Sequence, residues 1–158
     1  MMAMKGKKKI NVLIVCTGNT CRSPMAEGIL KKMLGGDDSV EVLSGGLMAH
    51  EGERVSEDAV EALAAMNIDI SSHTAKNING DVVRDADLIL TMTQAHKDMI
   101  CAVYGPDAAK KTYTICEYAH FDGEIADPFG LGIKVYRRCA EELEGALEKV
   151  LERIRAEL

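Results

Sequence analysis

The sequence predicts an α/β fold: a single three-layer domain with a central four-stranded parallel sheet and helices on both faces. Short apolar runs typical of buried strands alternate with helical patterns along the whole chain, as in doubly wound α/β proteins. With 158 residues, 47% of them hydrophobic and 28% charged, the chain has the length and composition of one globular domain with its own core. We therefore expect residues 1–158 to form one domain.

Two strands and two helices are expected in the first half of the chain. They cover 10–15 (strand), 24–34 (helix), 40–43 (strand) and 57–66 (helix). Ser23 directly before Pro24 marks the start of the first helix, because serine is a good N-cap and proline is favoured at the first helical position. Ser56 can cap the second helix, whose Val60 and Leu63 are expected to face inward.

The second half continues the alternation. Its expected elements are a strand within 87–93, a helix that starts at Thr93 or Gln94, a strand over 111–116 and a helix over 133–157. Gly105-Pro106 ends the third helix, because proline cannot continue it. The last helix carries an apolar stripe at helical spacing, formed by Cys139, Leu143, Leu147, Val150 and Ile154.

The beginning and the net charge of the chain limit its location and its partners. Residues 1–9 are basic and are expected to form a flexible arm, while the apolar run over 10–15 is shorter than the roughly 7 residues of a secretion core. No run approaches the roughly 18 apolar residues of a membrane span. The net charge of −6 disfavours nucleic acid. We therefore expect a cytoplasmic protein with no membrane or nucleic-acid partner.

The five cysteines are expected to be reduced thiols. Their number is odd and none forms a CxxC pair, so neither a disulfide framework nor a structural metal site is expected. Three of them are interpreted as small buried hydrophobic residues; these are Cys101, Cys116 and Cys139.

The segment from Cys16 to Pro24 is the most informative part of the chain. Cys16 ends the first strand, and ligands of parallel sheets bind beyond the carboxyl ends of the strands. Gly18 allows a tight turn, and the helix that starts near Pro24 offers unpaired backbone N–H groups. We therefore expect a cup that binds a tetrahedral oxyanion, with the Cys16 thiol at its floor.

The side chains in and around this cup suit phosphoryl transfer. Arg22 can hold two phosphoryl oxygens with its planar guanidinium, and the positive field of the cup favours the Cys16 thiolate. Ser23 can donate its hydroxyl to this thiolate. A leaving group needs a proton donor, and Asp127 is our candidate, because Pro128 restricts how the carboxyl group is presented. The alternative for Asp-Pro is an ordinary turn.

These segments together resemble the low-molecular-weight protein tyrosine phosphatase family from end to end. The resemblance rests on Cys16-x5-Arg22-Ser23-Pro24, Ser44-Gly45, Ser72-His73, Asp85-Ala86-Asp87-Leu88, Met92-Thr93 and Asp127-Pro128. It implies that Cys16 is the nucleophile, Arg22 the phosphate clamp and Asp127 the general acid, with a phosphocysteine intermediate and neither metal nor cofactor. It also implies that the substrate contacts Thr17, Gly18, Asn19, Thr20, Cys21, Ser23 and Phe129.

The resemblance also assigns supporting residues around the loop. Asn19 is expected to adopt a strained conformation that is held by Ser23, Ser44 and His73. Cys21 corresponds to a cysteine that can trap the oxidised nucleophile in a reversible disulfide, and the alternative is a spectator thiol.

Position 20 bears on the substrate, because the protein arginine phosphatase branch of the family carries threonine there. The Thr20 hydroxyl can hydrogen-bond a guanidinium group or a water molecule beside the P–N bond, and Asp127 would face a cationic group. We therefore expect hydrolysis of phosphoarginine in phosphorylated proteins by a monomeric enzyme. The alternative is a phosphotyrosine phosphatase.

Two more remote alternatives stay open at this point. A thiol-dependent arsenate reductase shares the fold and the cup, but it needs two further cysteines within exchange distance, and Met92 stands where one is expected. A binding module without turnover would carry the same cup, and Cys16-dependent release of p-nitrophenol from p-nitrophenyl phosphate distinguishes it from an enzyme.

Overall fold

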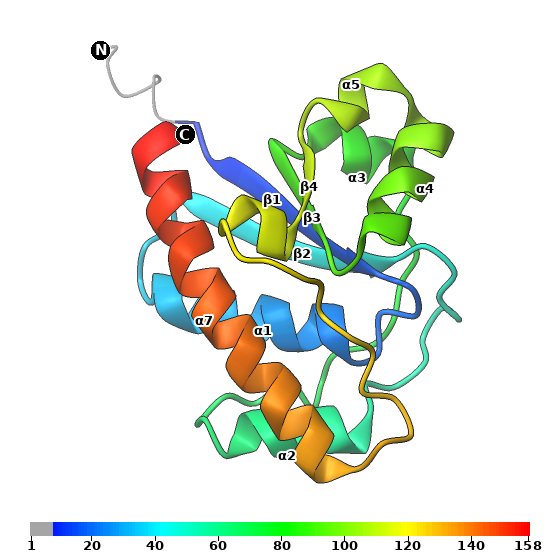
Figure 1. The fold of residues 1–158 in the computed structure, drawn as a ribbon, viewed down its shortest axis with the longest axis vertical. Coiled ribbons are helices and arrows are strands. Elements are labelled where there is room, and N and C mark those ends of the chain that lie inside the picture. The colour runs from blue at the N-terminus through cyan, green and yellow to red at the C-terminus, as the bar shows by residue number, and fades with distance from the viewer. Residues whose placement is uncertain (1–7) are drawn as a thin grey trace.

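The computed structural model describes residues 8–158 and confirms the expected α/β fold (Figure 1). Four strands form one parallel sheet in the order β2-β1-β3-β4. The strands are β1 (Ile10–Cys16), β2 (Val40–Gly46), β3 (Leu88–Thr91) and β4 (Thr112–Thr114). Of the expected basic arm over 1–9, residues 1–7 lie outside the described residues, and Lys8 and Lys9 are exposed.

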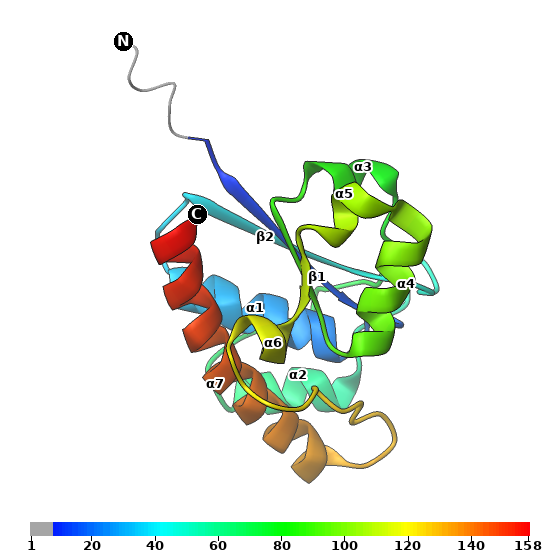
Figure 2. The ribbon, with the colours of Figure 1, turned by 45° about the horizontal axis from the view of Figure 1, so that its top comes forward.

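Helices cover both faces of the sheet, which gives three layers (Figure 2). One face carries α1 (Arg22–Leu34), α2 (Glu57–Ala64), α6 (Ile115–Tyr118) and α7 (Ile133–Glu157). The other face carries α3 (Gly80–Asp85), α4 (Gln94–Tyr104) and α5 (Pro106–Ala109).

The central strand β1 connects the two cores because its side chains alternate between the faces. Val12 and Ile14 belong to the larger cluster beneath α1 and α7. Leu13 and Val15 belong to the smaller cluster, in which they meet Val83 and other residues of the opposite layer. A strand buried on both faces explains the continuous apolar run that the sequence shows.

Helix α1 begins two residues earlier than expected, and Ser23 does not cap it. Cys21 occupies the N-cap position, without a side-chain hydrogen bond to the helix, and Ser23 is the second helical residue. The Ser23 hydroxyl is instead hydrogen-bonded to the side chains of Cys16 and Asn19. This use of the hydroxyl leaves backbone N–H groups at the start of α1 free to face an anion.

Helices α2, α3 and α4 agree with the sequence-based expectations only in part. Helix α2 ends at Ala64, and Leu63 is buried as expected whereas Val60 is only half-buried. Helix α3 was not expected from the sequence; the Asn79 side chain caps it by accepting a hydrogen bond from the Val82 N–H at 2.9 Å. Thr93 caps α4, and Gly105 ends it in a left-handed conformation, as the sequence predicts.

The expected strand over 111–116 is wrong at its C-terminal end. Strand β4 stops at Thr114, whose side chain forms a reciprocal capping box with Glu117 and starts α6. Cys116 therefore lies in a helix, where it is buried as expected. Cys139 is also buried, but Cys101 is half-buried, so its interpretation as a core residue is wrong.

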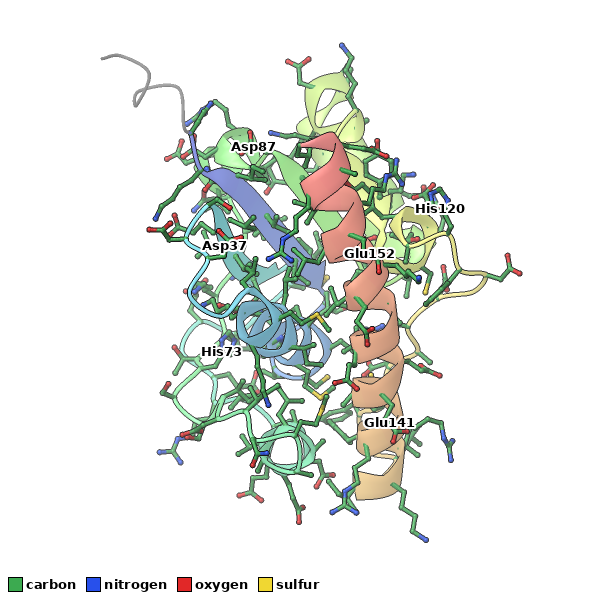
Figure 3. All side chains as sticks on the ribbon, turned by 90° about the vertical axis from the view of Figure 1, so that its left-hand side faces the viewer. Asp37, His73, Asp87, His120, Glu141 and Glu152 are labelled. Carbon is green, nitrogen blue, oxygen red and sulfur yellow. The ribbon has the colours of Figure 1, made fainter. Side chains whose placement is uncertain are left out.

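Helix α7 has the predicted bounds, and its whole apolar stripe is buried. It packs across α1 and α2. Figure 3 shows Glu141 and Glu152 on its outer side, where both are exposed. Within residues 8–158, no helix has both the length and the apolar composition that crossing a membrane requires.

Candidate active site

The loop between β1 and α1 closes around the Cys16 thiol. Cys16 is 2% exposed, and its Sγ lies 2.9 Å from Ser23 Oγ. The Asn19 N–H donates to the same sulfur at 3.3 Å. Two hydrogen-bonding groups therefore converge on the sulfur.

The end of β2 holds the first part of this loop. The Leu47 N–H donates to the Cys16 carbonyl at 3.0 Å, and the Met48 N–H donates to the Thr17 carbonyl at 2.9 Å. Gly46 makes this approach possible, because a Cβ atom there would lie 2.6 Å from the Thr17 carbonyl oxygen. The strand end thus fixes the loop through its backbone.

Asn19 is the central residue of the loop. It is fully buried and has a φ of 56°, in the left-handed region that asparagine tolerates better than most residues. Its Nδ2 donates to Ser23 Oγ at 2.8 Å and to Ser44 Oγ at 3.0 Å. Its Oδ1 accepts from the Lys76 N–H at 3.1 Å and lies 3.2 Å from His73 Nε2. The structure thus brings together the three supporting residues that the sequence predicts.

Glu27 extends this network and was not expected from the sequence. Its Oε1 accepts from Ser44 Oγ at 2.5 Å, and its Oε2 is 2.6 Å from Lys31 Nζ. His73 Nδ1 lies 3.9 Å from Glu27 Oε1, and burial lowers the pKa of His73. The available signal was the spacing of Glu27 four residues after Ser23, which puts both on one side of α1.

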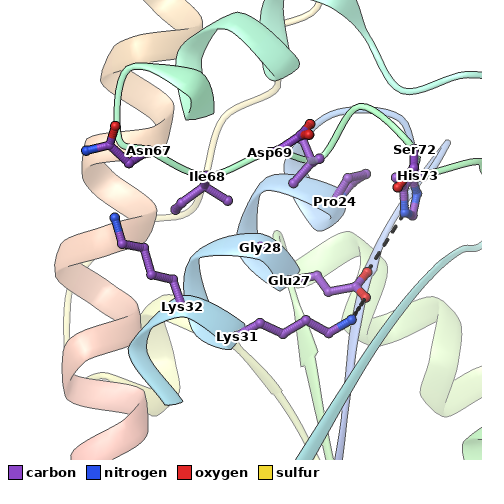
Figure 4. Close-up of a pocket in the computed structure, with 11 residues that line it drawn as sticks. Pro24, Glu27, Gly28, Lys31, Lys32, Asn67, Ile68, Asp69, Ser72 and His73 are labelled. Atoms are coloured by element: carbon purple, nitrogen blue, oxygen red, sulfur yellow. Dashed lines mark hydrogen bonds and ion pairs between the residues drawn. The ribbon is translucent and has the colours of Figure 1, made fainter. Parts of the chain in front are cut away.

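A surface hollow of about 520 Å³ lies along α1, separate from the cup (Figure 4). Glu27 and His73 form part of its wall, and Figure 4 shows their side chains pointing toward one another. Figure 3 also places His73 beside α1. The hollow therefore borders the residues that support the loop, rather than the thiol itself.

Arg22 connects the loop to the segment that carries Asp127. Its side chain is buried, and Nη1 donates to the Ile125 carbonyl at 2.8 Å. Its Nη2 lies 3.8 Å from Asp127 Oδ2. The buried Nε has no partner within residues 8–158. An oxyanion in the cup would supply the acceptor that this N–H lacks.

Asp127 is placed at the edge of the cup by these contacts. Its side chain is 54% exposed, and Oδ1 accepts from the Phe129 N–H at 3.1 Å. Cys21 Sγ lies 3.7 Å from the same oxygen. Phe129, expected to contact the substrate, is 72% exposed. This side of the site is therefore open to solvent.

Cys21 differs from Cys16 in its surroundings. It is 7% exposed, and burial, together with the neighbouring Cys16 and Asp127, raises its pKa to about 12. Cys21 is therefore a neutral thiol at neutral pH. Its protective role stays a prediction, because a disulfide with Cys16 would depend on attack by a thiol that ionises poorly.

Two threonines line the loop on different sides. Thr20 is half-buried, its carbonyl accepts from the Ser56 N–H at 2.8 Å, and its hydroxyl lies near Gly18. Thr17 is exposed, and its hydroxyl lies 2.9 Å from His96 Nε2. Sequence reasoning missed His96, because nothing in its spacing connects α4 with a loop 79 positions earlier.

Known proteins are similar in sequence to this chain along most of its length. A protein-arginine-phosphatase of Geobacillus stearothermophilus is 41% identical over 148 residues, which are 92% of this chain and 97% of that protein. The low molecular weight protein-tyrosine-phosphatase PtpB of a Staphylococcus epidermidis strain is 38% identical over 141 residues, 89% and 96% of the two chains. A Staphylococcus haemolyticus protein named Arsenate reductase 2 is 36% identical over 140 residues, 89% and 95% of the two chains.

Solved structures and the family comparison agree with these relatives. The YwlE arginine phosphatase of Geobacillus stearothermophilus superposes with a TM-score of 0.86, over 94% of each chain. A YwlE variant with a phosphorylated active-site serine superposes with a TM-score of 0.88 at 33% identity, over 94% of this chain and 97% of that one. Residues 11–158 match the sequence model of the family described as low molecular weight phosphotyrosine protein phosphatase. The chain therefore belongs to this family.

Proposed function

We propose that this protein hydrolyses phosphoarginine residues of proteins, with Cys16 as nucleophile, Arg22 as phosphate clamp and Asp127 as general acid and base. The observation that carries the proposal is the loop around Cys16, whose sulfur lies 2.9 Å from the Ser23 hydroxyl and accepts from the Asn19 N–H. Such a preorganised set of donors is suited to an oxyanion and to a thiolate. The remaining loop residues, Gly18 and Thr20 among them, complete the cup.

The reaction proceeds in two steps. In the first, the Cys16 thiolate forms an S–P bond while the P–N bond breaks, and the electron pair stays on the arginine nitrogen, which takes a proton from Asp127. In the second, Asp127 accepts a proton from water as the water oxygen attacks phosphorus. The S–P bond then breaks and the thiolate is restored. Arg22 and the loop N–H groups stabilise the phosphoryl charge in both steps.

The structure of a relative supports a covalent intermediate on an active-site side chain, which is the role proposed here for Cys16. The YwlE variant with a phosphorylated active-site serine carries the phosphoryl group on a side chain of its active site. Serine oxygen in place of sulfur would make the intermediate more durable, because an alkoxide is a poorer leaving group than a thiolate.

The choice of phosphoarginine rests on Thr20 and on Asp127. Within the described residues, no hydrogen bond engages the Thr20 hydroxyl, so it is available to a polar group of the substrate. The exposed Asp127 carboxyl can exchange hydrogen bonds with the N–H groups of a guanidinium, which a phenyl ring does not offer. Relatives named as arginine phosphatases and as tyrosine phosphatases both align with this chain.

The test compares rates on phosphoarginine and phosphotyrosine peptides of the same sequence. We expect the unmutated protein to prefer phosphoarginine, and Thr20→Val, which keeps the shape but removes the hydroxyl, to reduce this preference by about 10-fold or more. Thr20→Ile adds a methyl group and should shift the preference further toward phosphotyrosine. A phosphotyrosine preference in the unmutated protein would overturn the substrate proposal and leave the two-step reaction standing.

The arsenate reductase alternative has a relative behind it but lacks a matching set of thiols. Beyond the loop, Cys116 and Cys139 are buried, and burial raises the pKa of Cys139 to about 12. Cys101 is half-buried on α4. Arsenate consumption coupled to disulfide formation in the purified protein would favour this alternative over hydrolysis.

A further inference from the structure

The imidazole of His96, on α4, contacts the loop between β1 and α1 from outside that loop. His96 lies in the first turn of α4, is 7% exposed, and donates its backbone N–H to the Thr93 side chain at 3.2 Å. Its Nε2 lies 2.9 Å from Thr17 Oγ1. Thr17 directly follows Cys16, so this contact links the start of α4 to the first residue of the loop.

The hydrogen-bond pattern indicates which nitrogen of His96 carries the proton. Nδ1 is buried and has no partner within residues 8–158. A buried unpaired N–H is rarer in proteins than a buried unpaired acceptor, so Nδ1 is the unprotonated nitrogen. Nε2 then carries the hydrogen and donates it to Thr17 Oγ1.

Burial favours the neutral form of this imidazole. Burial and the Arg22 guanidinium lower the pKa of His96, while Asp127 and Glu124 oppose that shift to a smaller extent. Protonation of the ring would also place a hydrogen on the buried Nδ1, which has no partner within residues 8–158. The neutral Nε2–H form is therefore the one that meets Thr17.

This arrangement determines what the Thr17 hydroxyl can do. Its oxygen accepts from His96, so its own hydrogen is directed elsewhere. The Thr17 backbone is fixed on the opposite side by the Met48 N–H, which donates to its carbonyl at 2.9 Å. Thr17 is itself exposed and directly follows Cys16 in the loop. Its O–H is thus a donor held in place from two sides.

We propose that His96 is a positioning residue for the reaction, and that it orients the Thr17 hydroxyl to donate a hydrogen bond to an oxygen of the phosphoryl group bound in the cup. The proposal rests on the proposed function, because it takes the cup around Cys16 as the phosphoryl site. It adds a residue of α4 to a site otherwise built by the loop, by β2 and by the Asp127 segment.

A double-mutant cycle tests this proposal. Thr17→Val removes the donor and His96→Leu removes its support, and we expect each to lower kcat/KM on p-nitrophenyl phosphate by about 10-fold. The double variant should be no worse than Thr17→Val alone, because both changes remove the same hydrogen bond. Additive losses in the double variant would overturn the proposal.

Conservative variants separate positioning from simple packing. His96→Gln retains an N–H donor within reach of Thr17, and Thr17→Ser retains the hydroxyl, so both should recover most of the activity. If His96→Leu fails to fold, this pair and the ¹⁵N shifts of the His96 ring carry the test. A protonated Nδ1 in those spectra, or equal activities of Thr17→Val and the unmutated protein, would contradict the proposal.

A binding measurement keeps the result independent of turnover. Calorimetric titration with inorganic phosphate should give an affinity about 10-fold weaker for Thr17→Val and for His96→Leu, with the same coupling in the double variant. If the protein binds phosphate with this coupling but hydrolyses no substrate, the proposed function fails and the role of His96 stands. If turnover is intact and no coupling appears, the proposed role of His96 fails and the proposed function stands.

Discussion

The two sides of the active site are built differently. On one side, Asn19 is fully buried and its side chain is hydrogen-bonded to residues of α1, β2 and the segment before α3. On the other, the Asp127 side chain is 54% exposed and Phe129 is 72% exposed. The side that we propose to bind the phosphoryl group is therefore preorganised, and the side that we propose to meet the leaving group is open.

This difference indicates how the same kind of loop can occur in relatives that are named for different substrates. The part that we propose to bind the phosphoryl group is fixed by a buried network, so we expect substitutions there to affect folding as well as chemistry. The part that meets the remainder of the substrate has few contacts, so it tolerates change without loss of stability. Each prediction below tests one side against the other.

The largest effect is expected for Cys16→Ser on the fixed side. Loss of the thiolate should reduce kcat by about 10⁵-fold or more, because the nucleophile of the covalent step is gone. Inorganic phosphate should still bind, since the loop N–H groups and Arg22 remain. Steady-state kinetics and calorimetry measure the two quantities, and substantial residual turnover would refute the role of Cys16.

Asp127→Ala should lower kcat by about 10²- to 10⁴-fold on a phosphorylated peptide, because the leaving nitrogen loses its proton donor. The loss should be smaller for p-nitrophenyl phosphate, whose leaving group needs little protonation. Single-turnover kinetics on both substrates make the comparison. Equal rates for the variant and the unmutated protein on the peptide would be incompatible with a general acid at this position.

The free energy of unfolding should also respond more strongly to a substitution on the fixed side than to one on the open side. Asn19→Ala leaves the Ser44 hydroxyl, the Lys76 N–H and other buried groups without partners, so the free energy of unfolding should fall by about 2–3 kcal/mol. Asp127→Ala, at an exposed side chain, should change it by less than about 0.5 kcal/mol. Urea denaturation of the two variants in parallel measures both. Similar losses would show that the two sides are not built differently.

The smallest effect is a pH dependence of stability from the fixed side. Burial lowers the pKa of His73 below its ordinary value of 6.5 in the folded protein. The unfolded chain therefore binds a proton near pH 6.5 while the folded chain does not, so the free energy of unfolding falls as the pH decreases below about 6.5. His73→Gln should flatten this fall. An unchanged slope in the variant, measured by denaturation at pH 5.5 to 7.5, would argue against a buried neutral His73.

Much of the fold could be predicted because local patterns carry it. The apolar stripe of α7 recurs at helical spacing from Cys139 to Ile154, and the predicted bounds of this 25-residue helix agree with the structure. Helix α3 has only six residues, too few for a periodic pattern. The run that ends at Cys116 looks like one strand, although the capping box of Thr114 and Glu117 divides it into a strand and a helix.

The candidate catalytic residues of the loop could be grouped from their spacing, whereas the residues that support the loop could be predicted only in part. Cys16, Arg22 and Ser23 lie within eight positions, so their spacing in the sequence brings them together. Apart from Ser23, the side-chain partners of Asn19 lie 25, 54 and 57 positions away, and no local pattern connects them. Resemblance to the family supplied Ser44 and His73. Neither resemblance nor spacing supplied Glu27 or His96, which only the packing of helices onto the loop reveals.

The contact between Arg22 and the Ile125 carbonyl joins two events that are separate in the chemistry. The guanidinium that would hold the phosphoryl group also anchors the backbone two residues before the proton donor, at 2.8 Å. Because Ile125 lies two residues before Asp127, we expect a shift of the Arg22 side chain to be transmitted along the backbone to the Asp127 carboxyl. In the proposed mechanism, binding of the phosphoryl group and placement of the proton donor therefore depend on the same side chain.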